Sequence, residues 1–261
     1  MPDFVGSTLK ENVAIVSINR PDLHNAFNEV VIEELTSAFE ELGKDKDVRV
    51  IVLRGEGKSF CAGADVNWMS KMVGYSLDEN VADASAMARM LRTIRDCPKP
   101  TIARVHGAAI GGGVGLTAAC DIAVALTSAM FCLSEVKLGI IPAVISPFVM
   151  EKIGPGHMRR YALTAERFGA AEAKRIGLVH DVVQTEEELD EHIDSIARTL
   201  IANGPAALAA AKRTLTDVAG MQWDAIQKLT TRRVAEIRVS PEGQEGLKAF
   251  LEKREPKWPN S

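Results

Sequence analysis

The sequence predicts an α/β fold, with an α/β core followed by a helical C-terminal region. Up to about residue 150, strand-like runs alternate with segments of helical periodicity, which is the pattern of mostly parallel strands joined by crossover helices. After about Pro155 the segments are helical in period. A chain of 261 residues is long enough for one large α/β domain with an appendage. We assign residues 1–195 to the core and residues 196–261 to the helical region.

The first elements follow from periodicity and capping. Residues 12–19 (NVAIVSIN) alternate apolar and polar side chains, as a half-buried strand does. Asn28 can cap a helix that continues to about Leu42, because apolar residues then recur at helical spacing. A second strand covers residues 48–55 and ends in the loop GEGKSFCAGAD, and a helix is expected around residues 77–95.

A third strand, residues 100–107 (PTIARVHG), runs into a glycine-rich segment. The remaining expected elements are a helix at 116–120, a strand at 121–127, an extended piece at 130–135 and helices at 156–164, 169–177, 186–202, 205–219 and 221–239. Ser240 and Pro241 then begin a last helix, as its N-cap and its first residue.

The composition gives no reason to expect nucleic acid or a membrane as a partner. The formal charge is -4 at pH 7, and the basic residues are scattered. The longest apolar run is too short to span a bilayer, and the start of the chain lacks the features of a signal peptide. Four cysteines without a C-x-x-C pair and five dispersed histidines favour reduced, buried thiols in a cytoplasmic protein that holds no metal.

The glycine-rich segment GGGVGL allows three interpretations. Residues 113–118 fit the dinucleotide fingerprint G-x-G-x-x-G/A. That fingerprint requires an acidic residue at the end of the next strand, which here ends in Thr127, Ser128 and Ala129. The glycines can instead expose backbone N–H groups at a helix start, where they would stabilise an oxyanion, or simply permit close strand–helix packing.

Two other segments favour the oxyanion interpretation. The turn CAGAD ends the loop after the second strand, so that two turns would meet at the carboxyl edge if the second and third strands are parallel neighbours. Glu135 is a single carboxylate next to an apolar run, in a setting that makes it more basic than a free carboxylate. The alternative for Glu135 is a capped or salt-bridged loop residue, paired for instance with Lys137.

The sequence resembles the crotonase family, the enoyl-CoA hydratase/isomerase superfamily. The resemblance rests on five blocks in order: NRPDLHNAFN, GKSFCAGADV, VHGAAIGGGVGLTAACDIAVA, SEVKLGIIP and LTAERFGAAEAKRIGLVHDVV. It implies the ClpP-like spiral of repeated ββα units with a helical C-terminal region that forms trimers, usually doubled to hexamers. It also implies an acyl-CoA thioester as substrate, so that coenzyme A is part of the substrate and no separate cofactor is expected.

By motif position, the resemblance assigns the thioester oxygen to the amides of Ala64 and Gly112 and the acid/base role to Glu135. Family hydratases have a second glutamate two residues after the glycine triplet, where this chain has Gly115. Three interpretations follow from that departure. Glu135 acts alone in hydration, the enzyme is an isomerase that shuttles one proton, or the substrate supplies a carboxylate of its own.

The combination of GGGVGL with SEVKLGIIPAVISPF resembles bacterial hydratases of branched glutaconyl-CoA esters, namely the 3-methylglutaconyl-CoA hydratase of leucine breakdown and the isohexenylglutaconyl-CoA hydratase of acyclic terpene breakdown. We therefore expect an enoyl-CoA hydratase that acts on a branched or carboxylated substrate. A carboxylated acyl group would need a cationic partner. Lys71, Arg89 and Arg92 are candidates, but such residues are more often just solvated charges on a helix, and we select none of them. The rival hypotheses are an enoyl-CoA isomerase and a non-catalytic CoA-binding or RNA-binding member of the fold.

The resemblance also indicates residues for the CoA end of the substrate. Family positions place the adenine near Ala26, the pantetheine near Ala62 and a CoA phosphate near Lys58, which is otherwise a surface lysine. Phe250 and Lys253 match residues that reach the CoA of a neighbouring subunit. Other residues of the AGAD region have open roles: Cys61 is expected to be a buried small side chain, and Trp68, Met69 and Met72 either line the acyl pocket or only pack.

Overall fold

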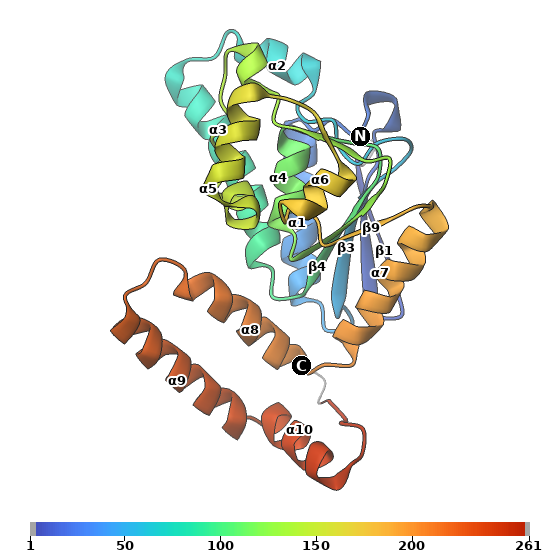
Figure 1. The fold of residues 1–261 in the computed structure, drawn as a ribbon, viewed down its shortest axis with the longest axis vertical. Helices are drawn as coiled ribbons and strands as arrows, with labels where there is room; N and C mark the ends of the chain where they lie inside the picture. Colours follow the sequence, from blue (N-terminus) through green and yellow to red (C-terminus); the bar gives the residue numbers. More distant parts are fainter. Residues whose placement is uncertain (1–3, 259–261) are drawn as a thin grey trace.

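A six-stranded sheet forms the centre of the computed structural model, which describes residues 4–258 (Figure 1). Its strands lie in the order β1-β2-β3-β4-β6-β9, and all neighbours are parallel except the antiparallel pair β1 and β2. Their bounds are β1 Val5–Lys10, β2 Val13–Ile18, β3 Val50–Gly55, β4 Thr101–Val105, β6 Ile122–Leu126 and β9 Asp181–Val183. Because β3 and β4 are parallel neighbours, the CAGAD turn and the glycine-rich turn lie at the same edge of the sheet, as predicted.

A second, three-stranded sheet has the order β5-β7-β8. Its strands are β5 Ala108–Ile110, β7 Met130–Cys132 and β8 Phe168–Gly169. β5 and β7 are parallel, and β7 and β8 are antiparallel. This small sheet lies beside the carboxyl ends of the large one, because β5 follows β4 after a turn at His106 and Gly107.

Helices connect the strands and cover the large sheet on both faces. The helices are α1 Glu29–Lys44, α2 Val66–Met72, α3 Leu77–Asp96, α4 Gly112–Ala119, α5 Ser146–Thr164, α6 Ala170–Arg175, α7 Glu186–Ile201, α8 Pro205–Val218, α9 Trp223–Val239 and α10 Pro241–Glu252, with short 3-10 helices η1 Pro21–Leu23 and η2 Glu135–Leu138. α7 packs on one face of the sheet, whereas α1, α3 and α4 lie on the other (Figure 1).

The large sheet has one hydrophobic core on each face, because successive side chains of a strand point to opposite faces. On β3, Val50 and Val52 pack with Leu189 and Ile193 of α7, while Ile51 and Leu53 point into the larger core with α1 and α3. Successive strand residues point to opposite faces of a sheet, so a strand covered on both sides is apolar at almost every position. The burial of Val50 to Leu53 on both faces explains why this part of β3 is a continuous apolar segment.

Capping residues fix the helix starts where the sequence predicts them. The side chain of Asn28 accepts a hydrogen bond from the amide of Val31 at the start of α1. Ser240 accepts from Gly243 at the start of α10, with Pro241 as the first helical residue. The mostly parallel sheet with helices on both faces confirms the predicted α/β class.

Four short strands depart from the sequence predictions. β1 was not predicted, β5 separates the third predicted strand from the glycines, and β8 and β9 interrupt the region after Pro155 that was expected to be helical throughout. The glycines themselves belong to α4, which therefore begins at Gly112 rather than at residue 116. The helix predicted at 156–164 is the second half of α5, beyond a kink at Gly154 and Pro155.

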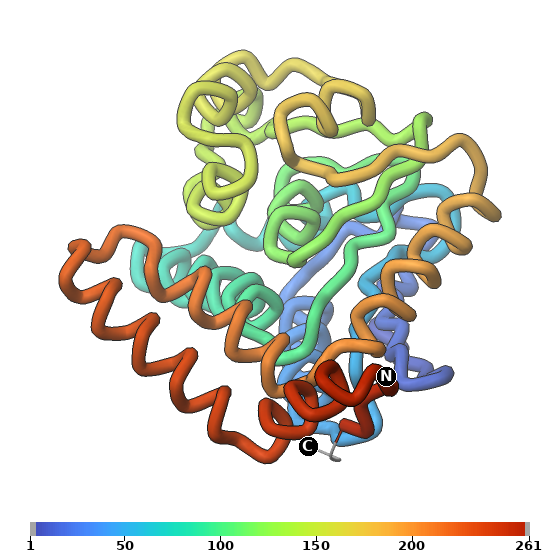
Figure 2. Tube along the Cα trace, turned by 60° about the horizontal axis from the view of Figure 1, so that its bottom comes forward, coloured from blue at the N-terminus to red at the C-terminus, as the bar shows by residue number. Residues whose placement is uncertain are grey.

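The C-terminal helices α8, α9 and α10 extend away from the sheet (Figures 1 and 2). The boundary expected between residues 195 and 196 falls inside α7, whose residues on both sides of it pack on the sheet. The helical region that projects from the core therefore starts at α8. Among the described residues, no helix combines the length and the apolar character needed to cross a membrane. All four cysteines are buried and free.

Candidate active site

Ala64, Gly112 and Glu135 line one cavity of about 370 Å³ at the carboxyl ends of β3 and β4. The three residues come from separate segments: the turn after β3, the start of α4 and the start of η2. The structure thus brings together the groups that the sequence analysis placed in one site.

The turn that carries Ala64 is held on both of its sides. Cys61 pairs with β5, because its amide donates to the carbonyl of Ala108 and its carbonyl accepts from Ile110, each at 3.0 Å. On the other side, the amide of Phe27 donates to the carbonyl of Gly63 at 2.8 Å. Within residues 4–258 the amide of Ala64 has no acceptor, so it remains available to a ligand in the cavity.

The glycine turn likewise presents a backbone amide that has no acceptor among the described residues. Gly111 has φ +52°, and its amide donates to Cys132 at 2.8 Å. Gly112 is the first residue of α4, where backbone N–H groups have no intrahelical partner, and its amide finds no acceptor among the described residues. A Cβ at Gly112 would lie 2.1 Å from Cζ of Phe27. The glycine is therefore required by close packing, and the same packing keeps its amide free of a side chain.

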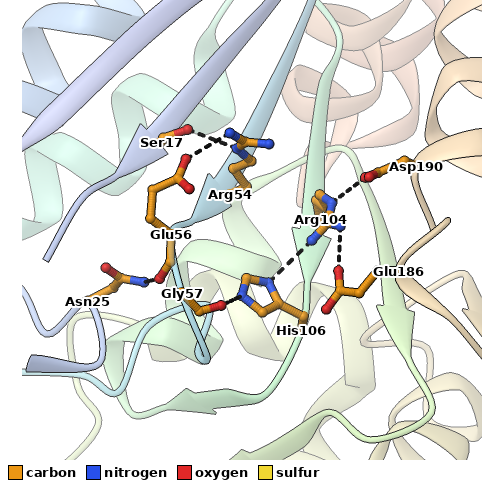
Figure 3. Close-up of polar contacts among 9 residues, drawn as sticks. All are labelled: Ser17, Asn25, Arg54, Glu56, Gly57, Arg104, His106, Glu186 and Asp190. Carbon is orange, nitrogen blue, oxygen red and sulfur yellow. Dashed lines mark hydrogen bonds and ion pairs between the residues drawn. The ribbon is translucent and has the colours of Figure 1, made fainter. Parts of the chain in front are cut away.

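The loop that leads into the first turn is fixed by a polar network (Figure 3). Asn25 Nδ2 donates to the carbonyls of Glu56 at 2.7 Å and Ser59 at 2.6 Å. His106, at the end of β4, contacts the carbonyl of Gly57 through Nε2 at 3.0 Å (Figure 3). Burial lowers the pKa of His106, which suits a neutral imidazole that donates from Nε2. The buried Arg104 side chain next to it is held by Glu186 and Asp190 of α7.

A buried ion pair anchors the other end of the turn. Arg20 Nη2 lies 2.6 Å from Asp65 Oδ2, with side chains only 9% and 5% exposed. The second oxygen of Asp65 accepts from the amide of Asn67 and so caps α2. Burial opposes ionisation of Asp65, but the hydrogen bonds from Arg20 and Asn67 leave its pKa below the usual value. The turn between Cys61 and Asp65 is thus tied to the loop before α1.

Glu135 is a half-buried carboxylate, and one of its two oxygens has no hydrogen-bond partner among the described residues. Its Oε2 is buried and accepts no hydrogen bond from the described residues, and within that part of the chain it forms no ion pair with Lys137. A Cβ at Gly111 would lie 3.2 Å from its Oε1, which places the carboxylate directly beside the glycine turn. Burial raises the pKa of Glu135. These observations oppose the interpretation of Glu135 as a salt-bridged loop residue.

Gly115, the position of the second family glutamate, is closed to any side chain. A Cβ there would lie 2.5 Å from Cγ2 of Ile145 and 3.6 Å from Cδ1 of Leu91. Ile145 is 2% exposed and belongs to the IPAVIS segment that precedes α5. The space of the missing carboxylate is therefore filled by an apolar side chain.

Comparison with known proteins now identifies the family. A family model described as enoyl-CoA hydratase/isomerase matches residues 8–261. The chain belongs to this family. It is 34% identical over 249 residues to a crotonyl-CoA hydratase of Syntrophomonas wolfei, with 94% of each chain covered. It is 33% identical over 266 residues to a peroxisomal Delta(3,5)-Delta(2,4)-dienoyl-CoA isomerase of Arabidopsis thaliana, covering 98% of this chain and 96% of the relative. The crystal structure of an enoyl-CoA hydratase from Shewanella pealeana has a TM-score of 0.94 and 43% identity, with 98% and 96% of the two chains covered.

The residues expected at the CoA end of this enoyl-CoA hydratase/isomerase family member fall into two groups. The segments that carry Ala26 and Ala62 lie side by side, because the Ala62 amide donates to the carbonyl of His24 at 3.0 Å, and Lys58 is exposed on the loop that carries Ala62. Phe250 is 82% exposed at the end of α10, and neither it nor Lys253 lines the cavity. A role for these two residues in CoA binding requires a neighbouring subunit.

Cys61 and the residues after the AGAD turn have packing and lining roles. Burial raises the pKa of the Cys61 thiol to about 12, so it is a buried small side chain rather than a nucleophile. Trp68, Met69 and Met72 line the cavity. Within residues 4–258, no three His, Cys, Asp or Glu side chains are arranged to hold a metal ion.

Two features of the cavity wall are absent from the sequence predictions. Ile145 fills the space beside Gly115, which no local pattern indicates. The α3 residues Asn80, Asp83, Ala84 and Met87 form one face of that helix and line the cavity. Their spacing of three, four and seven residues is the signal that could have identified this face. Asp83 is thereby a second carboxylate in the cavity.

Proposed function

We propose that this protein is an enoyl-CoA hydratase that adds water across the 2,3 double bond of an acyl-CoA thioester. The observation that carries the proposal is the meeting of two acceptor-free amides, Ala64 and Gly112, with the unpaired carboxylate of Glu135 in one cavity. The names of the relatives support the same activity.

The arrangement suits a reaction that passes through a thioester enolate. Attack of water at C3 places negative charge on the thioester oxygen, and two amides aimed at that oxygen stabilise it. One such donor is commonly worth about 3 kcal/mol of the activation barrier. Glu135 is held where burial favours its protonated form, so it can exchange a proton with C2. Small residues at both turns let the thioester approach the backbone.

The acyl group is proposed to be neutral, linear or branched. Among the described residues, no lysine, arginine or histidine lines the cavity. Lys71 pairs with Glu29 at 2.5 Å, Arg92 pairs with Asp96 at 3.1 Å, and neither they nor Arg89 belongs to the lining. A distal carboxylate, as in the 3-methylglutaconyl-CoA suggested by the sequence resemblance, would therefore face Glu135 and Asp83 without a cation. This charge pattern favours 3-methylcrotonyl-CoA or crotonyl-CoA over 3-methylglutaconyl-CoA.

A panel of these three esters tests the proposal, with hydration followed as loss of the enoyl absorbance. We expect turnover of the neutral esters and a reduction of at least ~100-fold in the Glu135→Gln variant, with binding of the ester retained. A variant that hydrates at the wild-type rate would remove Glu135 from the mechanism. A wild-type protein that binds the esters without converting them would support the non-catalytic alternative.

An isomerase is the second candidate, since Ile145 replaces the second carboxylate and one carboxylate suffices for shuttling a proton between carbons. The similarity to a dienoyl-CoA isomerase points the same way. A 3-enoyl-CoA substrate separates the two activities, because an isomerase would create the conjugated double bond and raise the enoyl absorbance. We expect hydration of the 2-enoyl ester to be the faster reaction.

A further inference from the structure

Hydration of an enoyl ester requires a group that accepts a proton from water and a group that donates one to C2. Position 115 cannot hold the first group, because Ile145 occupies its space. We propose that Asp83 accepts the proton of the attacking water while Glu135 delivers the proton to C2. This inference rests on the proposed hydratase function. Asp83 and Glu135 are the two titratable residues that line the cavity within the described part of the chain.

Asp83 lies on the helix face that passes over the glycine turn. A Cβ at Gly112 would lie 3.1 Å from Cε of Met87, so Met87 contacts the oxyanion side of the cavity. Asp83 precedes Met87 by four residues and therefore sits one helical turn away on the same face, about 5–6 Å along α3. Asp83 therefore lines the same cavity as Gly112 and Glu135, one helical turn from the contact at Met87.

The orientation of Asp83 is fixed by an indole. Trp68 Nε1 donates to Asp83 Oδ1 at 3.1 Å. The Trp68 side chain is buried, and its ring centroid lies 5.9 Å from that of Phe27, the ring that packs on Gly112. The second oxygen of Asp83 accepts no hydrogen bond from the described residues. One oxygen is thus anchored, and the other is available to a water molecule in the cavity.

The surroundings of the two carboxylates indicate which is the base. Burial raises the pKa of both carboxyl groups, and a hydrogen bond opposes that rise in each, from the Trp68 indole at Asp83 and from its own amide at Glu135. Glu135 has a buried oxygen without a donor. Pairs of carboxylates in different environments commonly divide the acid and base roles in this way. Asp83 is accordingly the carboxylate base and Glu135 the carboxylic acid.

In the resulting step, the oxygen of water forms a bond to C3 and one water proton passes to Asp83. The electrons of the double bond move toward C2 and the thioester oxygen, where the amides of Ala64 and Gly112 hold the enolate. The carbonyl then re-forms as C2 takes the proton of Glu135. Water has been added across the double bond, and solvent returns a proton to Glu135 and removes one from Asp83.

The test compares two reactions that need different numbers of groups. Hydration of crotonyl-CoA needs both carboxylates, whereas exchange of the C2 protons of butyryl-CoA with deuterium oxide needs only Glu135. We expect Asp83→Asn to lower kcat for hydration by at least ~100-fold and to retain exchange, whereas Glu135→Gln loses both. Asp83→Glu should recover part of the hydration rate, and Trp68→Phe should lower it. Asp78→Asn, an exposed residue of the same helix outside the cavity lining, is the matched control and should retain both reactions.

The outcomes separate this inference from the proposed function. Hydration by Asp83→Asn at the wild-type rate would overturn the role of Asp83 and leave the hydratase function standing. Loss of exchange together with hydration in Asp83→Asn would show a structural role and would also overturn it. Failure of the wild-type protein to hydrate any ester, with exchange intact, would overturn the hydratase function itself.

Discussion

At the scale of single residues, Gly115 and Ile145 form a complementary pair in which one residue has no side chain because the other fills its space. We predict that Gly115→Ala lowers the free energy of unfolding by about 1–3 kcal/mol, because the new Cβ would lie 2.5 Å from Ile145 Cγ2. The same change should cost much less in an Ile145→Ala background, where the methyl group has room. Urea unfolding of the two single variants and the double variant measures this coupling. Additive effects would contradict the assigned contact.

The second prediction at this scale concerns the stability cost of an ionised Glu135. The pKa of Glu135 is higher in the folded than in the unfolded protein. Its favourable contribution to the free energy of unfolding is therefore complete at pH values below its pKa in the unfolded chain. That contribution is lost as the pH rises through its pKa in the folded protein. Glu135→Gln has no such loss. We therefore expect the variant to gain stability over the wild type between pH 4 and pH 8, as measured by urea unfolding at several pH values. A constant difference across this range would show that Glu135 is as well solvated in the folded as in the unfolded chain.

At the scale of elements, the Arg20–Asp65 ion pair connects the loop before α1 with the start of α2. Removal of Arg20 would leave a buried carboxylate without its cation, and such changes typically cost about 3–5 kcal/mol. We predict that Arg20→Met destabilises the protein by this order and reduces kcat/KM, because the Ala64 amide is held by the same turn. Lys174→Met is the control, since it breaks an exposed pair with Asp181 and should cost less than about 1 kcal/mol. Equal losses in the two variants would contradict the structural role of the buried pair.

The elements predicted from sequence are those with a local signal. Asn28 and Ser240 cap the helices that the sequence predicts, and β3 begins with an apolar run of four residues, Val50 to Leu53. β8 and β9 have two and three residues, too few for periodicity to appear, and they exist because other strands offer them partners. Local pattern thus finds the helices and the strands with a buried face, whereas pairing with other strands adds β8 and β9. β1 has six residues but is exposed after Val5, so it shows no pattern of a buried face.

The candidate site was predictable to the same extent. Ala64, Gly112 and Glu135 belong to sequence motifs, and parallel strand order brings two of their turns to one edge. The contact between Gly115 and Ile145 depends on the packing of segments 30 residues apart, and Asp83 matters only because α3 turns that face toward the cavity. Neither the contact between Gly115 and Ile145 nor the orientation of Asp83 can be inferred from the neighbouring residues in the sequence. The structure is needed to place Ile145 beside Gly115 and Asp83 in the cavity wall.

At the scale of the whole molecule, the projecting helices α8, α9 and α10 carry apolar surface that the chain itself does not cover. α8 and α9, both fully within the described residues, contain no buried residue. Helical stability in proteins comes mainly from packing of an apolar face, so these helices are incomplete on their own. The most exposed large apolar side chains of this region are Leu215, Trp223, Val239, Phe250 and Leu251, each more than 70% exposed.

We predict that this surface is covered by further copies of the chain, as a trimer or a hexamer. Sedimentation velocity should show an assembly of three or six chains. The double variant Phe250→Ser/Leu251→Ser should shift it toward smaller species, because two exposed apolar side chains lose their contact area. Leu9→Ser, an exposed apolar residue on the edge strand β1, is the control and should leave the assembly intact. If dissociation also raises KM for the CoA ester, Phe250 and Lys253 act across the subunit boundary. A stable monomer with full activity would contradict both the assembly and this shared CoA site.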